Sequence, residues 1–204
     1  MLVERILLIR HAETAWNAEG RWQGHEPVSL NDTGRQQAQK LADYLSARPI
    51  GSVYSSDLPR ARETAALLAQ ALALTVIEDH RLREWHLGVF QGLTRDEIQS
   101  RFPHEFQQTR ENYFDFIVPR GESRRQTQVR AHAAFNDIFA AGLGPEVAIV
   151  THGGTLRLLL YKLFESDAPS LAKIDFANTS ITTIERHADH WRIVGLAATP
   201  HLIA

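Results

Sequence analysis

The chain has 204 residues, of which 44% are hydrophobic, and a formal net charge of -2. This length predicts a single domain with a sizeable core, and the near-neutral charge gives no reason to expect nucleic acid or an anionic membrane as a partner. The chain has no cysteine, which excludes disulfides, thiolate catalysis and cysteine-ligated zinc.

The N-terminal half alternates predicted strands and helices. An unbroken apolar run over residues 6–9 predicts an inner strand that ends at Arg10 and His11, followed by a loop to residue 31. Apolar residues at helical spacing over 38–45 predict a helix that begins at Asp32 or Thr33 and ends before Pro49. Strands are predicted at 50–55 and 74–77, with a helix over 58–72 between them. This alternation implies a parallel sheet with right-handed crossovers.

The pattern changes between residues 94 and 116, where aromatic and charged residues mix and Pro103 separates two predicted short helices. A helix is predicted over about 123–139, then a buried strand at 147–151 and a helix with leucines at 156, 159, 160 and 163. Residues 180–185 and 191–196 are predicted to pair as a hairpin through residues 187–190. We therefore predict an α/β fold over residues 1–204. It is a three-layer α/β/α sandwich with a mostly parallel sheet and a cap-like helical insertion at about 94–122, over the C-terminal ends of the strands.

Two predicted inner strands each end on a histidine. Arg10 and His11 follow the first strand, and His152 follows the strand at 147–151 and precedes Gly153. Ligands of parallel sheets bind beyond the carboxyl ends of the strands, so both imidazoles are predicted to meet at one site. A neutral imidazole is a nucleophile towards phosphorus, and an adjacent guanidinium binds phosphoryl oxygens. The alternatives are a histidine bonded to backbone and a glycine turn that only fits a helix.

Arg60 and Glu84 are further candidates. Arg60 falls in the first turn of a predicted helix, where the helix dipole disfavours a cation unless an anion lies between them. The alternative is a surface ion pair of Arg60 with Glu13 or Glu63. Glu84 precedes the aromatic Trp85, and its carboxyl group is a candidate proton donor to a leaving alkoxide, or else a solvated side chain.

No metal site is predicted. The sequence has no His-Glu-x-x-His motif, no carboxylate cluster and no glycine-rich phosphate loop of the Gly-x-x-x-x-Gly-Lys-Ser/Thr type. The remaining histidines lack ligand-like spacing, and of these we expect His25 and His86 near the site. No secretory leader and no apolar stretch of the roughly 20 residues that span a bilayer are apparent, so we expect no membrane partner and a cytoplasmic protein.

Taken in order, these segments resemble the histidine phosphatase superfamily, the phosphoglycerate mutase-like fold. The matching segments are Arg-His-Ala-Glu-Thr with Trp-Asn at 10–17, Gly-Arg-Trp-Gln-Gly at 20–24, Ser-Ser-Asp-Leu-x-Arg-Ala at 55–61, Gly-Glu-Ser at 121–123, Val-Thr-His-Gly-Gly at 150–154 and Asn-Thr-Ser at 178–180. Within the superfamily the chain is similar to its phosphatase branch, such as α-ribazole phosphatases and broad-specificity phosphatases.

The resemblance implies a role for each matched residue. His11 would be the nucleophile that forms a phosphohistidine, His152 would stabilise the phosphoryl oxygens, and Glu84 would donate the proton. Five residues would bind the phosphate together with His152, of which Gly153 acts through its backbone: Arg10, Asn17, Gln23, Arg60 and Gly153. No metal or organic cofactor is implied, and the partner would be a small phosphomonoester.

The chain departs from the family pattern at Ala12, Pro27 and Phe90-Gln91, which stand where glycine, aspartate and Trp-Glu are common. Residues 84–88 also lack the arginine and tyrosine that help mutases to hold a substrate carboxylate. The resemblance therefore favours phosphomonoester hydrolysis, with phosphoglycerate mutase-type transfer as the alternative and a non-catalytic phosphate-binding module as a second alternative. The five aromatic residues of the insertion are expected either to line the pocket or to form a small core: Phe102, Phe106, Tyr113, Phe114 and Phe116.

Overall fold

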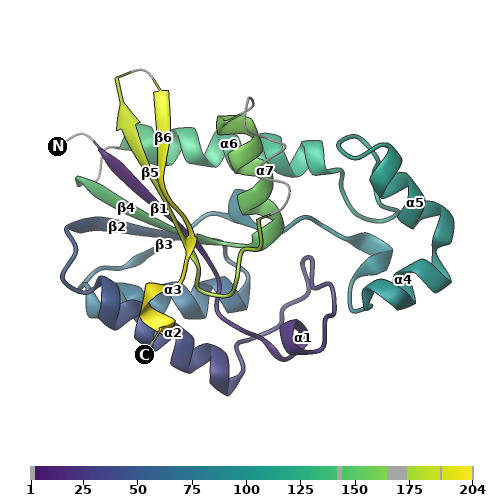
Figure 1. Cartoon of the computed structure of the whole chain (residues 1–204), viewed down its shortest axis with the longest axis horizontal. Helices are drawn as coiled ribbons and strands as arrows, with labels where there is room; N and C mark the ends of the chain where they lie inside the picture. Colours follow the sequence, from purple (N-terminus) through teal and green to yellow (C-terminus); the bar gives the residue numbers. More distant parts are fainter. Residues whose placement is uncertain (1–2, 142–143, 165–173, 189, 204) are drawn as a thin grey trace.

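The computed structural model describes residues 3–141, 144–164, 174–188 and 190–203, and a six-stranded sheet forms its centre (Figure 1). The strand order is β3-β2-β4-β1-β5-β6, in which the first four strands are parallel and the last two antiparallel. The mostly parallel sheet is thus confirmed. The strand bounds are β1 Arg5–Arg10, β2 Ile50–Ser55, β3 Val76–Glu78, β4 Glu146–Thr151, β5 Ile181–His187 and β6 His190–Ala198.

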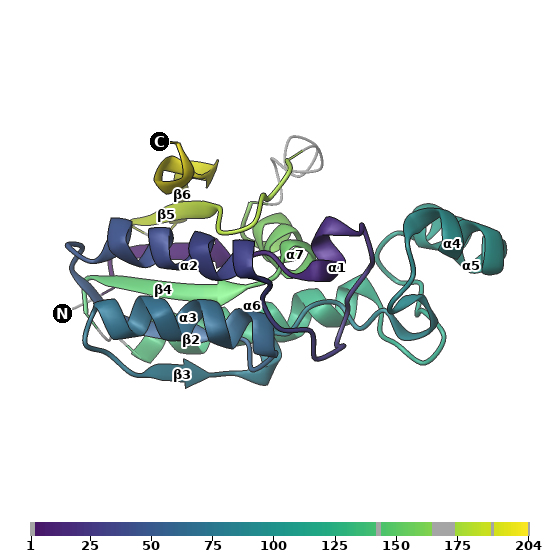
Figure 2. The same cartoon turned by 90° about the horizontal axis from the view of Figure 1, so that it is seen from below.

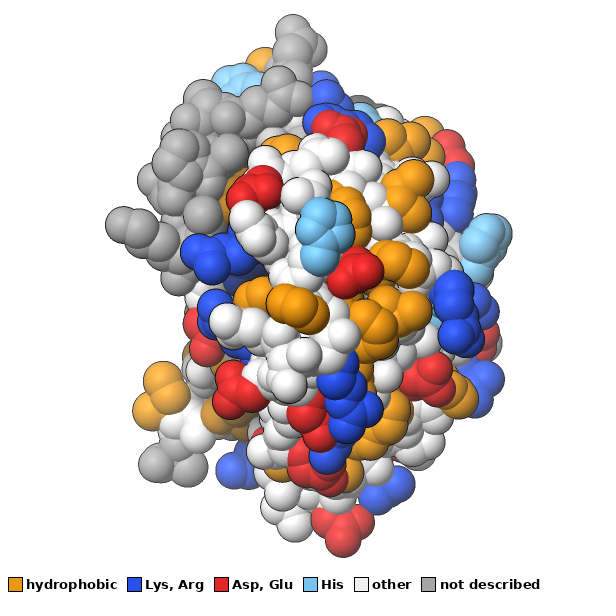
Figure 3. All heavy atoms as spheres, turned by 90° about the vertical axis from the view of Figure 1, so that its right-hand side faces the viewer, with side chains coloured by type: hydrophobic (Ala, Val, Ile, Leu, Met, Phe, Trp, Pro, Cys, Tyr) orange, Lys and Arg blue, Asp and Glu red, His pale blue; other side chains and the backbone are white. Residues whose placement is uncertain are grey.

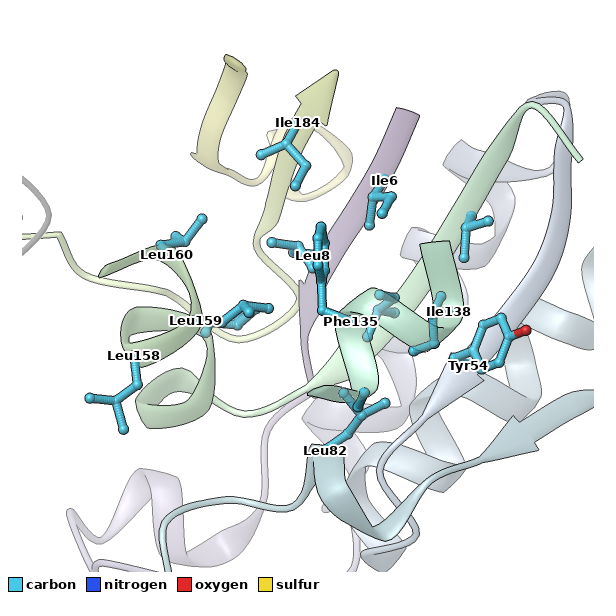
Figure 4. Close-up of a cluster of buried hydrophobic side chains, with 14 of the residues drawn as sticks. Ile6, Leu8, Tyr54, Leu82, Phe135, Ile138, Leu158, Leu159, Leu160 and Ile184 are labelled. Carbon is cyan, nitrogen blue, oxygen red and sulfur yellow. The ribbon is translucent and has the colours of Figure 1, made fainter. Parts of the chain in front are cut away.

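Helices cover both faces of the sheet (Figures 1 and 2). Leu7 and Ile9 of β1 face one core with α2 (Asp32–Leu45) and α3 (Pro59–Ala71). Ile6 and Leu8 face a second core with α6 (Arg124–Ala141) and α7 (Gly153–Leu163), which Figure 4 shows. Alternate residues of one strand therefore bury against opposite layers, which explains why the four inner residues of β1 and of β4 are all apolar.

The segment beyond the strand ends has a core of its own. Helices α4 (Arg95–Arg101) and α5 (Pro103–Glu111) lie away from the sheet in Figures 1 and 2, and Pro103 separates them as predicted. Their hydrophobic side chains pack with Trp85, Phe90 and Val118. On this end of the molecule, acidic, basic and hydrophobic side chains are interspersed over the surface (Figure 3).

The segment at residues 12–31, predicted as loop, contains a short helix, α1 (Ala15–Ala18). Thr14 and Asn17 form a capping box at its N-terminus, a local signal that the apolar pattern does not carry. Asn31, rather than Asp32 or Thr33, caps α2, because its Oδ1 accepts from the N–H of Gly34 at 2.7 Å. The third strand begins at residue 76 rather than 74.

The predicted terminal hairpin is confirmed, with β5 and β6 paired antiparallel at the edge of the sheet. Residue 189 of its predicted turn lies outside the described residues. Short 3-10 helices complete the chain: η1 His80–Leu82, η2 Gly88–Phe90 and η4 Pro200–Leu202. Among the described helices, none is both long and apolar enough to cross a membrane.

Candidate active site

A cavity of about 440 Å³ lies at the carboxyl ends of β1 and β4. These strands are parallel neighbours with Arg10 paired to Thr151, so the residues that follow them, His11 and His152, emerge side by side. Their ring centroids are 5.1 Å apart. Six of the eight residues predicted for the site line this cavity: Arg10, His11, Asn17, Gln23, Arg60 and Glu84.

The imidazole of His11 has one nitrogen tied to the backbone. Its Nδ1 lies 2.7 Å from the carbonyl oxygen of Ala12, which fits an N–H donor at Nδ1 and leaves the lone pair on Nε2. The residue is 3% exposed, and burial, followed by the charges of Arg60 and Arg10, lowers its pKa well below the ordinary value. The neutral, nucleophilic form is therefore favoured.

His152 occupies the N-cap position of α7, makes no capping hydrogen bond with its side chain and is completely buried. Its Nε2 lies 2.9 Å from the hydroxyl of Ser56, and its Nδ1 has no partner among the described residues. If the Ser56 hydroxyl donates to Nε2, then Nδ1 carries the proton and is a free donor. Burial and then the charges of Arg60 and His11 lower the pKa of His152 well below its usual range.

Arg10 and Arg60 bring two guanidinium groups to the cavity. Arg60 is 1% exposed, and it donates to the carbonyl oxygens of Gly24 at 2.7 Å and Glu26 at 3.0 Å. Those bonds replace the ion pair with Glu13 or Glu63 considered from the sequence. Burial lowers the pKa of Arg60 to about 10, so this side chain still carries its charge at neutral pH. Arg10 donates to the carbonyl oxygen of Phe176, and burial lowers its pKa as well.

Unpartnered buried polar atoms concentrate at this site. Among the described residues six such side-chain atoms occur, and four belong to predicted site residues. They are Nε of Arg10, Nε of Arg60, Nδ1 of His152 and Oε1 of Gln23. A buried donor without a partner costs roughly 1–3 kcal/mol. The nitrogens of the two arginines are donors, and Nδ1 of His152 is one when it carries the proton. Such donors left open close together are suited to an anion with several oxygens.

Asn17 and Gln23 approach the cavity from the segment after β1. Asn17 lines the cavity, and its Oδ1 accepts from the N–H of Thr14 at 3.1 Å. Gln23 is buried. Gly153 is the first residue of α7 and does not itself line the cavity, whereas its neighbour Gly154 does.

The carboxyl group of Glu84 is bound at the start of α7. It accepts hydrogen bonds from the backbone N–H of Trp85 at 2.9 Å, Gly154 at 3.0 Å and Thr155 at 3.0 Å. A Cβ at position 154 would lie 2.5 Å from Oε1 of Glu84, so glycine is needed there for the carboxyl group to approach. Gly154 thus serves the carboxyl group as well as the helix start.

Sequence reasoning missed the residues that hold the backbone of Glu84. Arg130, on α6, donates to the carbonyl oxygens of Arg83 at 2.6 Å and Glu84 at 2.7 Å, and it pairs with Glu122 at 2.5 Å. His25, expected near the site, binds the carbonyl oxygen of Glu84 through Nε2 at 2.7 Å. Burial lowers the pKa of His25 to about 4. The Gly-Glu-Ser match at 121–123 was the one signal for this support.

The ring of His86 lies 4.5 Å from that of His25, so both histidines expected near the site are placed there. Ser56 and Asn178 belong to segments that match the family pattern, but the sequence predicts no individual role for either residue. The amide of Asn178 donates to the carbonyl oxygen of His11 at 3.0 Å. These contacts orient the two histidines from elements far away in the sequence.

The outer part of the cavity is aromatic and basic. Trp16, Trp22, Trp85 and Tyr113 line it together with several arginines. Of the insertion's five aromatic residues only Tyr113 lines the cavity, and it also packs against a hydrophobic cluster. The other four pack in hydrophobic clusters without lining the cavity: Phe102, Phe106, Phe114 and Phe116. Most of these aromatic residues are therefore core. Among the described residues, no group of three or more metal-binding side chains is present.

The chain is similar to known proteins over nearly its whole length. A family model described as the histidine phosphatase superfamily (branch 1) matches residues 6–199. The chain is 40% identical to phosphoglycerate mutase-like protein 4 of Arabidopsis thaliana, over 97% of this chain and 86% of the relative. It is 36% identical to a metal-independent phosphoserine phosphatase of Arabidopsis thaliana, over 98% and 84% of the two chains. A mycobacterial glucosyl-3-phosphoglycerate phosphatase in complex with VO3 has a TM-score of 0.83 at 31% identity, with 95% and 99% covered.

Proposed function

This phosphatase belongs to the histidine phosphatase superfamily, and we propose that it hydrolyses a small phosphomonoester metabolite through a phosphohistidine on His11, without a metal ion. The observation that carries the proposal is the set of open buried nitrogens on Arg10 and Arg60, which line the cavity, and on His152, whose ring centroid lies 5.1 Å from that of the lining residue His11. Such a set is suited to the equatorial oxygens of a phosphoryl group in transfer.

In the first step, Nε2 of His11 attacks phosphorus and forms the N–P bond while the P–O bond to the alcohol breaks. The proton on Nδ1 stays hydrogen-bonded to the carbonyl oxygen of Ala12 and spreads the developing positive charge. Glu84 gives its proton to the leaving oxygen. Its three backbone hydrogen bonds hold the carboxyl group at the cavity wall.

In the second step, a water molecule attacks the phosphohistidine. Glu84, now ionised, takes a proton from that water as the new P–O bond forms and the N–P bond breaks. The products are inorganic phosphate and the regenerated imidazole of His11. Arg10, Arg60 and His152 hold the phosphoryl oxygens in both steps, with Asn17, Gln23 and the backbone of Gly153 completing the shell.

The test is the hydrolysis of p-nitrophenyl phosphate at mildly acidic pH by the parent protein and by the His11→Ala variant. We expect turnover by the parent and at least a 10³-fold loss in the variant, because the nucleophile is removed. Parent protein that is rapidly mixed with labelled substrate and quenched in alkaline detergent should carry label on one histidine, and later acid treatment should release that label. Equal activity of the two proteins would refute the proposal.

The name of one reported relative, phosphoglycerate mutase-like protein 4, makes mutase-type transfer the second candidate. A mutase must protect its phosphohistidine from water. We propose that the chain forms one domain and that its insertion at about 94–122 acts as a cap. Because this insertion is short, we expect it to exclude less water than a mutase needs to exclude. An enolase-coupled assay with 3-phosphoglycerate and a trace of 2,3-bisphosphoglycerate separates the two. Interconversion faster than phosphate release would favour the mutase.

A further inference from the structure

Arg124 is a lining residue of the cavity that the proposed chemistry does not use. It is the first residue of α6 and is half-buried. Its guanidinium lies 4.1 Å from the ring centroid of Trp85 and 4.2 Å from that of Tyr113. Nη1 donates to the carbonyl oxygens of Thr109 at 2.8 Å and Tyr113 at 2.9 Å. Ring contacts and two hydrogen bonds therefore fix this cation in place.

The charge of Arg124 is not matched by a described carboxylate. Its neighbour Arg125 pairs with Asp115 at 2.8 Å, and Arg130 on the same helix pairs with Glu122. Among the described residues Arg124 forms no ion pair, and its Nε and Nη2 donate no hydrogen bond. Burial lowers the pKa of Arg124, and the charge of Arg157, also at the cavity, acts in the same direction. An anion in the cavity would compensate both effects.

The position of Arg124 relative to Glu84 indicates which part of the substrate Arg124 would contact. Arg124 lies against Trp85, which directly follows Glu84, and the indole of Trp85 donates to the carbonyl oxygen of Glu122 at 2.7 Å. Glu84 is the proposed proton donor to the leaving oxygen. Arg124 therefore lies on the leaving-group side of the cavity.

We propose that Arg124 binds a second oxyanion, carried by the alcohol portion of the substrate and separate from the phosphoryl group that is transferred. This inference rests on the proposed function and names its substrate class: phosphomonoesters of acidic alcohols. Nη1 is used by the backbone, so the edge formed by Nε and Nη2 is left for bidentate binding of a carboxylate or a phosphate.

The experiment uses matched pairs of substrates that differ by the second oxyanion. For a carboxylate the pairs are 3-phosphoglycerate against glycerol 3-phosphate, and O-phosphoserine against O-phosphoethanolamine. For a second phosphate the pair is fructose 1,6-bisphosphate against fructose 6-phosphate. We expect the parent protein to prefer the acidic member of at least one pair by roughly 10- to 100-fold in kcat/KM, the range of a charge-assisted hydrogen bond.

The Arg124→Met variant should lower that preference to less than about threefold, because methionine keeps the packing but not the charge. Arg125→Met is the matched control, since Arg125 is exposed and paired with Asp115, and it should keep the parent's preference. A preference that survives Arg124→Met would overturn the inference.

The preference of the parent protein is informative even where the variant does not fold. If the parent hydrolyses p-nitrophenyl phosphate but prefers no acidic member of any pair, the inference on Arg124 is wrong and the proposed function stands. If the parent shows no more turnover of p-nitrophenyl phosphate than His11→Ala, the proposed function fails and the inference falls with it.

Discussion

Replacing Gly154 by alanine should separate the chemistry of Glu84 from the stability of the fold. The new Cβ would lie 2.5 Å from Oε1 of Glu84, where ordinary contact begins at 3.4 Å, so the carboxyl group must move by about 0.9 Å. A misplacement of roughly 1 Å costs a reacting group about 10²-fold in rate. The helix itself loses nothing, since alanine is favoured over glycine in a helix by about 0.5–1 kcal/mol.

The assay compares kcat on an alkyl phosphate with kcat on p-nitrophenyl phosphate, together with thermal unfolding. Gly154→Ala should lose about 10- to 100-fold on the alkyl ester, whose alkoxide needs a proton, and clearly less on the aryl ester. Glu84→Gln should show the same selectivity. Gly153→Ala is the comparison, because its Cβ would meet its nearest atom at 3.5 Å, and it should lose less than Gly154→Ala. Equal losses on both esters would refute Glu84 as the proton donor.

Three further predictions follow from the hydrogen bonds and the buried charges. Ser56→Ala removes the hydrogen-bond partner of Nε2 of His152 and should lower kcat about 2- to 10-fold in steady-state assays, which is the range of one neutral hydrogen bond. An unchanged kcat would contradict the orienting role of Ser56. Arg60→Met should raise the inhibition constant of inorganic phosphate by at least about 10-fold, and a constant within twofold of the parent's would exclude Arg60 from the phosphate site. The pKa values of His11, His25 and His152 are lowered in the folded protein, so the unfolded chain takes up protons first as the pH falls. The contribution of these histidines to the free energy of unfolding should thus be complete above pH 6.5 and decrease below it by up to about 1.4 kcal/mol per pH unit for each histidine, with the contribution of His25 ending at about pH 4. Urea unfolding at pH 7, 6 and 5 measures this free energy. A free energy of unfolding that does not change with pH would contradict the burial of these rings.

Those parts of the fold that depend on burial could be predicted from the sequence. Strands β1 and β4 lie in the sheet interior, and their apolar runs mark them within a residue. Strand β2 also lies in the interior, and its predicted bounds match those of the structure. The short edge strand β3 and helix α1 are harder to predict from the sequence, because few of their side chains are buried. Backbone pairing with β2 forms β3, and a capping box begins α1. The spacing Thr14-x-x-Asn17 does carry that signal, and it can be read only when side-chain capping is considered with the apolar pattern.

The site was predictable where a residue follows a strand and less so where it depends on tertiary contacts. His11 and His152 are placed by strand register alone. Arg60 was ambiguous because its partners are backbone carbonyl oxygens, and no sequence pattern reports on these. Arg130 donates to the carbonyl oxygen of Glu84, which lies 46 residues earlier in the chain. Nothing in the sequence distinguishes Arg124 from an ordinary residue at the start of a helix.

The place of β1 in the sheet has a consequence for how the protein folds. Arg5, at the start of this strand, contacts Glu146 and Glu185, which are 141 and 180 residues further along the chain. Closing loops of this length costs conformational entropy before any contact is gained, and topologies dominated by such pairings fold slowly. The strand that precedes His11 is synthesised before both of its neighbours, and it gains them only after β4 and β5, the second of which ends at His187, have left the ribosome. Catalytic competence should therefore appear in one late step rather than build up with chain length.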